Sequence, residues 1–434
     1  MRSELFNRNL AILLFAQAVS VTGWFAVVTA GGILGGSLAT NPALATLPVS
    51  LLIVGAAVST IFASWTMARV GRARGFAIGA TVGALGAACA FVATLTHNLA
   101  LLCGASIMIG CASAFSAQYR FAATECVDAA TAPRAIAIVH LGSIFGAFLG
   151  PGLISWGEAW VAGAPFGGSF VAIAGCYVLA ATVLLAFRPI TFSNEEEKTG
   201  GARALRVIAR GRFFIAAVTG AAVGCGVMTV VMSAAPLAMH VVDGFSLAAT
   251  AAVIQAHVLA MYLPSLISGF LIVRFGAGQV MIWGAALLGA TLIAGLAGRR
   301  MLHYSLALVA LGVGWNFLYV GGTSLLVRAH RPAERFRVQA LNDFSIWGIS
   351  AVASLSAGAV IHVLGWNGVL YGSIPAVLVG AMVLLWKGSG QGHEESTSSM
   401  SLDSPRSSCA LGTQRVRGGS QARSHPTSTG APGS

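Results

Sequence analysis

Long apolar runs, separated by short polar or glycine-containing turns, fill the chain as far as about position 387. Each run is about 20 residues long, which lets a helix cross a hydrocarbon core of roughly 30 Å at 1.5 Å per residue. Too few residues alternate with the period of two that a lipid-facing β-strand requires. The pattern predicts twelve membrane-spanning helices, with approximate spans 10–33, 46–68, 75–95, 98–122, 135–157, 166–187, 213–236, 247–273, 278–298, 303–327, 338–363 and 367–387.

The composition supports an all-α membrane protein. Of 434 residues, 56% are hydrophobic, 54 are glycine, and the mean hydropathy is +0.82, so one soluble core could not hide the apolar surface. Glycine and alanine let membrane helices pack closely. The first run follows Arg2 and Arg8 and is too long for a signal-peptide core, so we expect an uncleaved first helix.

The basic residues predict the orientation. Threading twelve spans through a bilayer leaves only Arg299 and Arg300, of 25 lysines and arginines, on one side. The positive-inside rule makes the other side the cytoplasm, with both termini there. We expect a multi-pass protein of a bacterial inner membrane. The net charge of +12 is spread between apolar runs instead of forming one patch, so we expect no nucleic-acid partner.

Two polar segments divide the chain. Residues 188–212 form a charged link between an N-terminal half, 1–187, and a C-terminal half, 213–387. Residues 388–434 are rich in Ser, Gly, Thr and Pro, which predicts a disordered cytoplasmic tail. Its arginines either contact anionic lipid or are simply solvated.

The halves share a weak internal repeat. Arg69 and Gly71, in the turn after the second span, align with Arg274 and Gly276 after the eighth, 205 residues later. Similarly, "TAPRAIAI" at 131–138 resembles "PAERFRVQ", 201 residues further on. Parallel copies of a six-helix unit would leave this pattern.

Twelve spans, a central link and a basic glycine turn in both halves resemble the major facilitator superfamily. The resemblance covers roughly residues 8 to 387 and implies two pseudo-symmetric six-helix bundles. The family's turn motif runs approximately G-x-x-x-D-R-x-G-R-R, and this chain keeps Arg69, Gly71 and Arg72 but has Ala68 at the aspartate position.

Two further motifs bear on coupling. "GSIFGAFLGPG" at 142–152 is similar to a motif of the family's antiporters, with Gly146, Gly150 and Pro151 matching but the closing glycine pair absent. Many proton-coupled members carry an arginine in the fourth helix where this chain has Ser106.

Charged residues near membrane helices are gate candidates. Arg120 and Glu125 lie about 140° apart around a helix, so they cannot pair along one face. The resemblance implies that Glu125 pairs with Arg69 or Arg72 as a cytoplasmic latch; the alternative is two solvated boundary charges. Asp343 either complements its helix dipole or substitutes for the missing aspartate. The predicted gate residues are Arg69, Gly71, Arg72, Arg120, Glu125 and Asp343.

The tenth span carries the best substrate candidates. In "GVGWNFLYVGGTS", Trp315, Asn316 and Tyr319 combine flat faces with polar groups, although close helix packing explains them equally well. His257 is a weaker candidate: it is either a group that titrates near neutral pH or a packed, hydrogen-bonded core histidine. The remaining predicted substrate-binding residues are Gln17, Trp24, Gln255, Asn342 and Trp347.

The sequence lacks the motifs that would indicate a nucleotide-driven transporter, a metal site or an enzyme. The chain has no G-x-x-x-x-G-K-[ST], and the seven cysteines form no metal-ligand spacing, so we expect reduced thiols, no cofactor and no enzymatic activity. We expect a monomeric secondary transporter in contact with membrane lipid, coupled to protons. The antiporter-like motif favours efflux of a small organic solute. Uptake of a nutrient or vitamin-like heterocycle, and a receptor or scaffold that keeps the fold without transport, are the alternatives.

Overall fold

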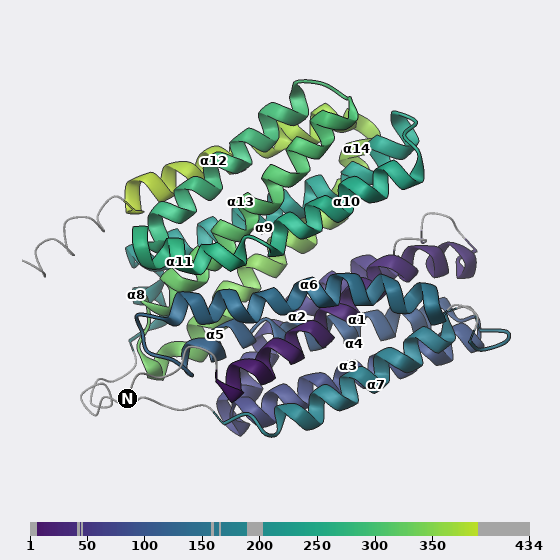
Figure 1. Ribbon diagram of the computed structural model, residues 1–434, viewed down its shortest axis with the longest axis horizontal. Coiled ribbons are helices and arrows are strands. Elements are labelled where there is room, and N and C mark those ends of the chain that lie inside the picture. Colours follow the sequence, from purple (N-terminus) through teal and green to yellow (C-terminus); the bar gives the residue numbers. More distant parts are fainter. Residues whose placement is uncertain are drawn as a thin grey trace, which may run out of the picture. The chain divides into compact units, whose positions relative to one another are not determined.

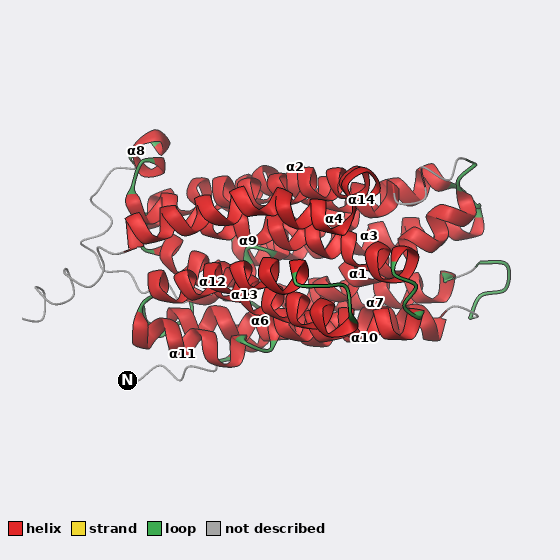
Figure 2. Cartoon of the chain, turned by 90° about the horizontal axis from the view of Figure 1, so that it is seen from above, coloured by secondary structure: helices red, strands yellow, loops and turns green. Residues whose placement is uncertain are grey.

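The computed structural model describes residues 7–40, 44, 47–157, 160–164, 166–188 and 203–388, which lie in one compact unit. These residues form helices and connecting loops and contain no strand (Figure 2), which confirms the all-α prediction. The first half contains α1 Arg8–Leu38, α2 Leu47–Val70, α3 Arg72–Leu95, α4 Leu99–Ser116, α5 Tyr119–Thr124, α6 Ala132–Gly157 and α7 Gly167–Leu184. The second half contains α8 Leu205–Ala209, α9 Arg212–Pro236, the π-helix η3 Leu237–Val242, α10 Leu247–Tyr262, α11 Ser265–Phe275, α12 Ala277–Leu296, α13 Met301–Val327, the 3-10 turn η4 Pro332–Glu334 and α14 Arg335–Gly388.

Eleven segments of the described chain are long and apolar enough to cross a membrane. The difference from twelve arises in α14, which contains both of the last two predicted spans. A straight helix of 54 residues would be about 80 Å long, far more than a bilayer. Gly365, with φ 64° and ψ −173°, interrupts the helical conformation and divides α14 into two arms (Figure 1).

The two basic glycine turns have the same backbone conformation. Gly71 joins α2 to α3 with φ 83° and ψ 166°, and Gly276 joins α11 to α12 with φ 83° and ψ 151°. Glycine adopts this region at little cost because it has no Cβ. Equal geometry at the repeated positions agrees with two copies of one structural unit. We call the end of the bundle at which these turns lie the Gly71 end.

Each half has its own apolar core. One buried cluster consists of residues between 10 and 187, and a second consists mostly of residues between 208 and 384. Phe145, Ile293 and Trp386 are large apolar side chains that are at least two-thirds exposed, as lipid-facing residues would be. The exact limits of the halves stay predictions. Most of the predicted link and nearly all of the predicted tail lie outside the described residues.

Candidate functional site

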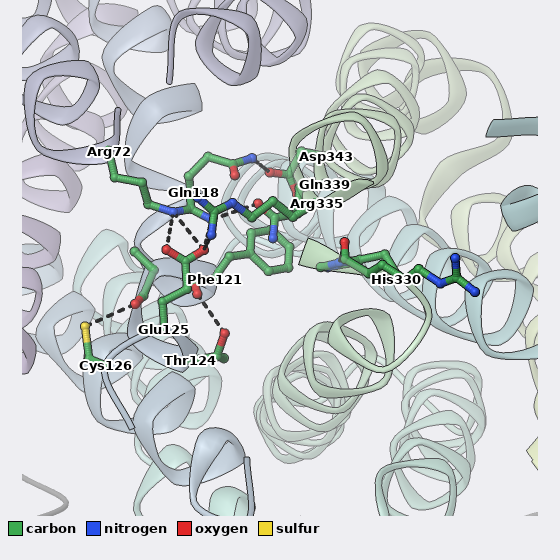
Figure 3. A network of polar contacts seen from close by, with 12 residues as sticks. Arg72, Gln118, Phe121, Thr124, Glu125, Cys126, His330, Arg335, Gln339 and Asp343 are labelled. Carbon is green, nitrogen blue, oxygen red and sulfur yellow. Dashed lines mark hydrogen bonds and ion pairs between the residues drawn. The ribbon is translucent and has the colours of Figure 1, made fainter. Parts of the chain in front are cut away.

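An ion pair joins two elements of the first half at the Gly71 end. Arg72 is the first residue of α3, and Glu125 follows α5 directly. Nε of Arg72 donates to both Glu125 carboxylate oxygens at 3.0 and 2.9 Å, and Nη2 donates to Oε1 at 2.6 Å (Figure 3). The contact involves residues that the family resemblance implied, while their role as a gate stays a prediction.

The same pair reaches across to the second half. Nη2 of Arg72 also donates to Oε1 of Gln339, at 3.1 Å, and Nη1 of Arg335 lies 3.3 Å from Oε1 of Glu125. Gln339 and Arg335 both belong to the first arm of α14. Charge-assisted bonds of this kind are among the stronger hydrogen bonds in proteins. The two halves are therefore held together at the Gly71 end.

A second ion pair between the halves is fully buried. Nη2 of Arg120, in α5, donates to Oδ1 of Asp343, in α14. Gln118 Nε2 donates to Oδ2 of Asp343 at 2.6 Å, and Asn342 Nδ2 donates to Oδ1 at 2.9 Å. Asp343 is thus bonded to the α5 region, while Gln339, four residues earlier on α14, accepts from Arg72 after the glycine turn. Both charged residues were gate candidates from the sequence, although no partner was predicted for Arg120.

Arg69 lies outside this network. It is exposed, and its guanidinium lies 3.7 Å from the centroid of the Trp65 ring. Of the two arginines that the resemblance offered to Glu125, the structure pairs only Arg72 with it, because Arg72 begins α3 and is almost fully buried.

The turn that leads into α14 carries another ion pair. Nε and Nη2 of Arg203 donate to the Glu334 carboxylate at 2.8 and 2.7 Å. The backbone N–H groups of Arg203 and Arg331 also donate to the Glu334 carboxylate. The Arg203 hydrogen bonds lower the pKa of Glu334 to about 2, so Glu334 is ionised at neutral pH.

An aromatic cluster lies between the halves, next to the buried ion pair. His140 of α6 packs against Tyr262, Trp315 and Tyr319 of the second half, with ring centroids 5.1, 5.4 and 5.3 Å away. Trp315 and Tyr319 stack at 4.9 Å with an interplanar angle of 15°. We call these four residues the His140 cluster. The Arg120 guanidinium lies 4.2 Å from the Tyr319 centroid, which connects the cluster to the ion pair with Asp343.

His140 is a functional candidate that sequence analysis missed. It is 7% exposed, and its Nε2 has no hydrogen-bond partner among the described residues. Such an atom is costly to bury, so its position needs an explanation. A single histidine in an apolar run is a weak signal. Only the packing of α6 against α10 and α13 brings it to the predicted Trp315 and Tyr319.

Two other predicted residues meet across the halves. Trp24 of α1 and Trp347 of α14 lie 5.2 Å apart between ring centroids, and both are partly exposed. Gln17 Nε2 donates to Ser143 Oγ at 2.9 Å, which joins α1 to α6. These residues lie on helices that line the contact between the halves, as a substrate-facing surface would.

Three predicted substrate-binding residues lie outside the His140 cluster and outside the contact between Trp24 and Trp347. Asn316 is fully buried, and its Nδ2 donates to Met261 O and Ser265 Oγ, both at 2.8 Å, next to the break between α10 and α11. His257 is fully buried with Nδ1 2.7 Å from Leu308 O, while its Nε2 has no hydrogen-bond partner among the described residues. Gln255 is exposed on α10.

Close packing accounts for the glycines of the antiporter-like motif. A Cβ added at Gly146 would lie 2.8 Å from Thr22 N, and one at Gly150 would lie 2.7 Å from Thr22 O. α6 therefore approaches the backbone of α1 at both positions, and any larger residue would push the helices apart. Pro151 follows within α6. In the described part of the chain, no three His, Cys, Asp or Glu residues gather as metal ligands would.

Comparisons with known proteins identify the family. A family model described as Major Facilitator Superfamily matches residues 13–263. The riboflavin transporter RfnT of Brucella anthropi is 36% identical over 380 residues, covering 87% of this chain and 94% of the relative. YddS of Bacillus subtilis, an uncharacterised transporter of the same superfamily type, is 31% identical over 378 residues, covering 83% of this chain and 86% of the relative.

Solved structures agree on the fold. The transporter FucP in the outward conformation aligns with a TM-score of 0.65 and 17% identity, covering 86% of this chain and 98% of FucP. A bacterial homologue of the iron transporter ferroportin, in an outward-facing state, aligns with a TM-score of 0.68 and 13% identity, covering 88% and 100%. The fold and the family inferred from the sequence are confirmed. This chain is an integral multi-pass membrane protein that belongs to the major facilitator superfamily.

Proposed function

We propose that this protein is a secondary transporter that takes up a flat, vitamin-like heterocycle, with riboflavin as the first compound to test. The His140 cluster carries the proposal, because it places stacked aromatic rings and a polar ring nitrogen between the two halves. The name of the RfnT relative, a riboflavin transporter, supports this solute class.

The cluster has the chemistry that such a solute requires. Trp315 and Tyr319 offer flat faces on which a heterocycle can stack, since offset aromatic pairs add about 0.5 to 1.5 kcal/mol beyond area burial. The unpartnered Nε2 of His140 can hydrogen-bond to ring nitrogen or carbonyl groups. Trp24 and Trp347 add a second aromatic pair that also spans the halves.

Alternating access would use the contacts at the Gly71 end. Arg72, Glu125, Gln339 and Arg335 join the halves there, so this end is closed. Opening it requires these bonds to break. If the orientation follows the positive-inside rule, the Gly71 end is cytoplasmic, and the bonds form the latch of a state that is closed to the cytoplasm.

The Arg120–Asp343 pair is the candidate for proton coupling. Protonation of Asp343 would remove its charge and weaken its hold on Arg120, which also lies over Tyr319 of the His140 cluster. One proton could thereby alter both the contact between the halves and the solute surface. Ser106, at the family's usual arginine position, is buried and donates to Leu102 O at 2.9 Å, so it needs no charged partner.

Efflux is the second candidate direction, favoured by Gly146, Gly150 and Pro151. Since packing against α1 explains both glycines, the motif carries less weight for export. Direction can be measured in intact cells that overproduce the protein and are given labelled riboflavin. Uptake predicts a higher internal level than in cells with empty vector, and efflux predicts a lower one.

Binding and transport need separate measurements. Riboflavin should raise the unfolding temperature of the purified protein, because a ligand that binds only the native state stabilises it. His140→Ala and Trp315→Ala should abolish the shift, while the control Trp160→Ala, in an exposed loop, should keep it. Binding without flux in proteoliposomes would favour a receptor. Absence of binding and flux would overturn riboflavin as the solute.

A further inference from the structure

The indole of Trp315 is anchored by a helix that contributes no ring to the His140 cluster. Its Nε1 donates to Sγ of Cys225 at 3.1 Å, and the two side chains are only 6% and 4% exposed. Trp315 belongs to α13, whereas Cys225 belongs to α9, 90 positions earlier. The indole N–H is a donor only, and it is the sole polar group of the side chain. Cys225 thus supplies the acceptor that a buried tryptophan requires.

Two glycines bring α9 within reach of α13. A Cβ added at Gly224 would lie 3.1 Å from the Cβ of Leu318. A Cβ added at Gly322 would lie 3.0 Å from Ala217 O. Both distances are shorter than the roughly 3.5 to 4.0 Å of a favourable contact between heavy atoms, so larger residues would push the helices apart. Because the helices approach closely here, the short side chain of Cys225 reaches the indole.

The sulfur atom determines how the indole is turned within its stack. Trp315 stacks on Tyr319 at 4.9 Å and 15°, and it meets Tyr262 edge to face at 5.9 Å and 90°. The torsion about the Cβ–Cγ bond of a tryptophan has two broad minima, about half a turn apart. Both minima keep the ring plane parallel to Tyr319, but only one of them directs Nε1 to Cys225. The hydrogen bond therefore selects which edge of the indole lies toward the other rings of the His140 cluster.

Buried hydroxyl groups in the helices of this protein show which substitutions keep an acceptor at position 225. Ser106 donates to Leu102 O at 2.9 Å, and Ser113 donates to Ile109 O at 3.1 Å. In the same way, Cys225→Ser would introduce a hydroxyl that donates to the carbonyl four residues earlier and still has a lone pair for the indole N–H. Cys225→Ala and Cys225→Val leave no acceptor there.

We propose that Cys225 is a positioning residue of the solute site: it fixes the Trp315 indole in the orientation on which a flat solute stacks. This role rests on the proposed function, in which the His140 cluster is the solute surface. Without the acceptor, the indole N–H would be buried and unpaired, which disfavours the observed orientation. A solute would then meet a Trp315 ring that is less well preorganised, and it would bind more weakly.

Uptake of labelled riboflavin into proteoliposomes tests this role through KM and the maximal rate. Cys225→Ala and Cys225→Val should raise KM about fivefold, the factor expected for one lost hydrogen bond, and leave the maximal rate within about twofold. Cys225→Ser should restore most of the affinity, because its hydroxyl accepts. Valine fills the space of the thiol, so agreement between the first two variants separates the acceptor from the volume. Cys103→Ala, at a buried cysteine of α4, is the control and should behave as the wild type does.

A double-mutant cycle in thermal unfolding tests the contact without any solute. Trp315→Phe keeps an aromatic ring but removes the N–H donor. Cys225→Val should lower the unfolding temperature in the wild type and much less in the Trp315→Phe background. Additive effects in the cycle, an unchanged KM for Cys225→Val, or an equal rise in KM for Cys225→Ser would each overturn the positioning role. If the wild type transports no riboflavin, the proposed solute is wrong, and the cycle alone decides whether Cys225 holds Trp315.

Discussion

Asp343 is a carboxylate with no exposure to solvent, and one guanidinium and two side-chain amides stabilise its charge. Removing one partner of a buried ion pair leaves an uncompensated charge, which costs about 3 to 5 kcal/mol. This cost exceeds the typical effect of a point mutation. At the residue scale, Arg120 and Asp343 therefore have the largest expected effect on stability.

Asp343→Asn should lower the free energy of unfolding by about 3 to 5 kcal/mol, because Arg120 keeps its charge without a partner. Arg120→Gln with Asp343→Asn should recover part of this loss. Thermal unfolding of the purified variants measures both effects. Asp243→Asn is the control, because its partner Arg299 is largely exposed, and it should cost less. Additive losses in the double variant would contradict a direct pair.

Glu125→Gln should weaken the latch while the protein is still produced at normal levels. The change removes the carboxylate charge that Arg72 and Arg335 both contact. We expect the equilibrium between the states open to the two sides of the membrane to shift by about 1 to 3 kcal/mol. Transport rates in proteoliposomes measure the effect. Arg72→Gln should act in the same direction, and Arg69→Gln much less. Equal effects of the two arginine variants would speak against the observed pairing.

The lowered pKa of Glu334 predicts a loss of stability at acid pH. Its pKa is lowered to about 2 in the folded protein from an ordinary value of 4.5. The unfolded chain therefore binds the proton first as the pH falls, and the contribution of Arg203–Glu334 is lost between about pH 5 and pH 2. Unfolding temperatures across this range should fall less steeply for Glu334→Gln. Parallel profiles for wild type and variant would refute the contribution.

At the element scale, the turn within α14 determines how the last two spans are arranged. Gly365 combines φ 64° with ψ −173°, a conformation that is almost restricted to glycine. Both arms pack against α9, where Ile349 of the first arm approaches Gly226 and Gly380 of the second approaches Val223. Trp366 Nε1 donates to Gly295 O at 3.2 Å immediately after the turn. The position requires glycine for its backbone and not for close packing, since a Cβ there would meet no atom within 4 Å.

Gly365→Ala should lower the free energy of unfolding by about 1 to 3 kcal/mol, because alanine is strained in this conformation. Gly372→Ala is the matched control: a Cβ there also meets nothing within 4 Å, and its φ is not positive. The control should be neutral or slightly stabilising. Thermal unfolding compares the two, and equal stability would show that the turn adapts to a side chain.

At the scale of the whole molecule, the orientation is the prediction on which the cytoplasmic gate depends. Arg299→Cys and Arg74→Cys place thiols at opposite ends of the bundle. The positive-inside rule predicts that a membrane-impermeant thiol reagent labels position 299 in intact cells and position 74 only after permeabilisation. The parent protein, which keeps its own cysteines, gives the background. The reverse pattern would move the Gly71 end to the outside.

Much of the architecture could be predicted from the sequence, because the length of an apolar run and the position of charged residues determine a membrane span without reference to the rest of the fold. Runs of about 20 apolar residues predict spans wherever a bilayer is the solvent, and this reasoning located all of the long helices. The ends of the helices were less accurate, and the last two spans proved to be arms of one element. The glycine turns were found from the repeated Arg-x-Gly pattern, and both glycines have a φ of 83°, which few other residue types adopt.

Only part of the candidate site could be predicted from the sequence. Glu125, Arg120 and Asp343 stood out because charges are rare and costly near a membrane. The resemblance offered Arg69 or Arg72 to Glu125, but the pairing of Arg120 with Asp343 could not be derived, because these residues are 223 positions apart and meet only where α5 packs against α14. His140 had no signal in its own helix. His257 was a candidate by type alone, and packing placed it against the backbone of α13 instead.

The sequence by itself determined a multi-pass helical protein, its family and its rare charged groups, since hydropathy and glycine positions act through local chemistry. Only the tertiary structure decided that Arg72 rather than Arg69 contacts Glu125, and that His140 joins Trp315 and Tyr319. These outcomes depend on contacts between helices far apart in the chain, whose crossing geometry depends on the packing of both surfaces together.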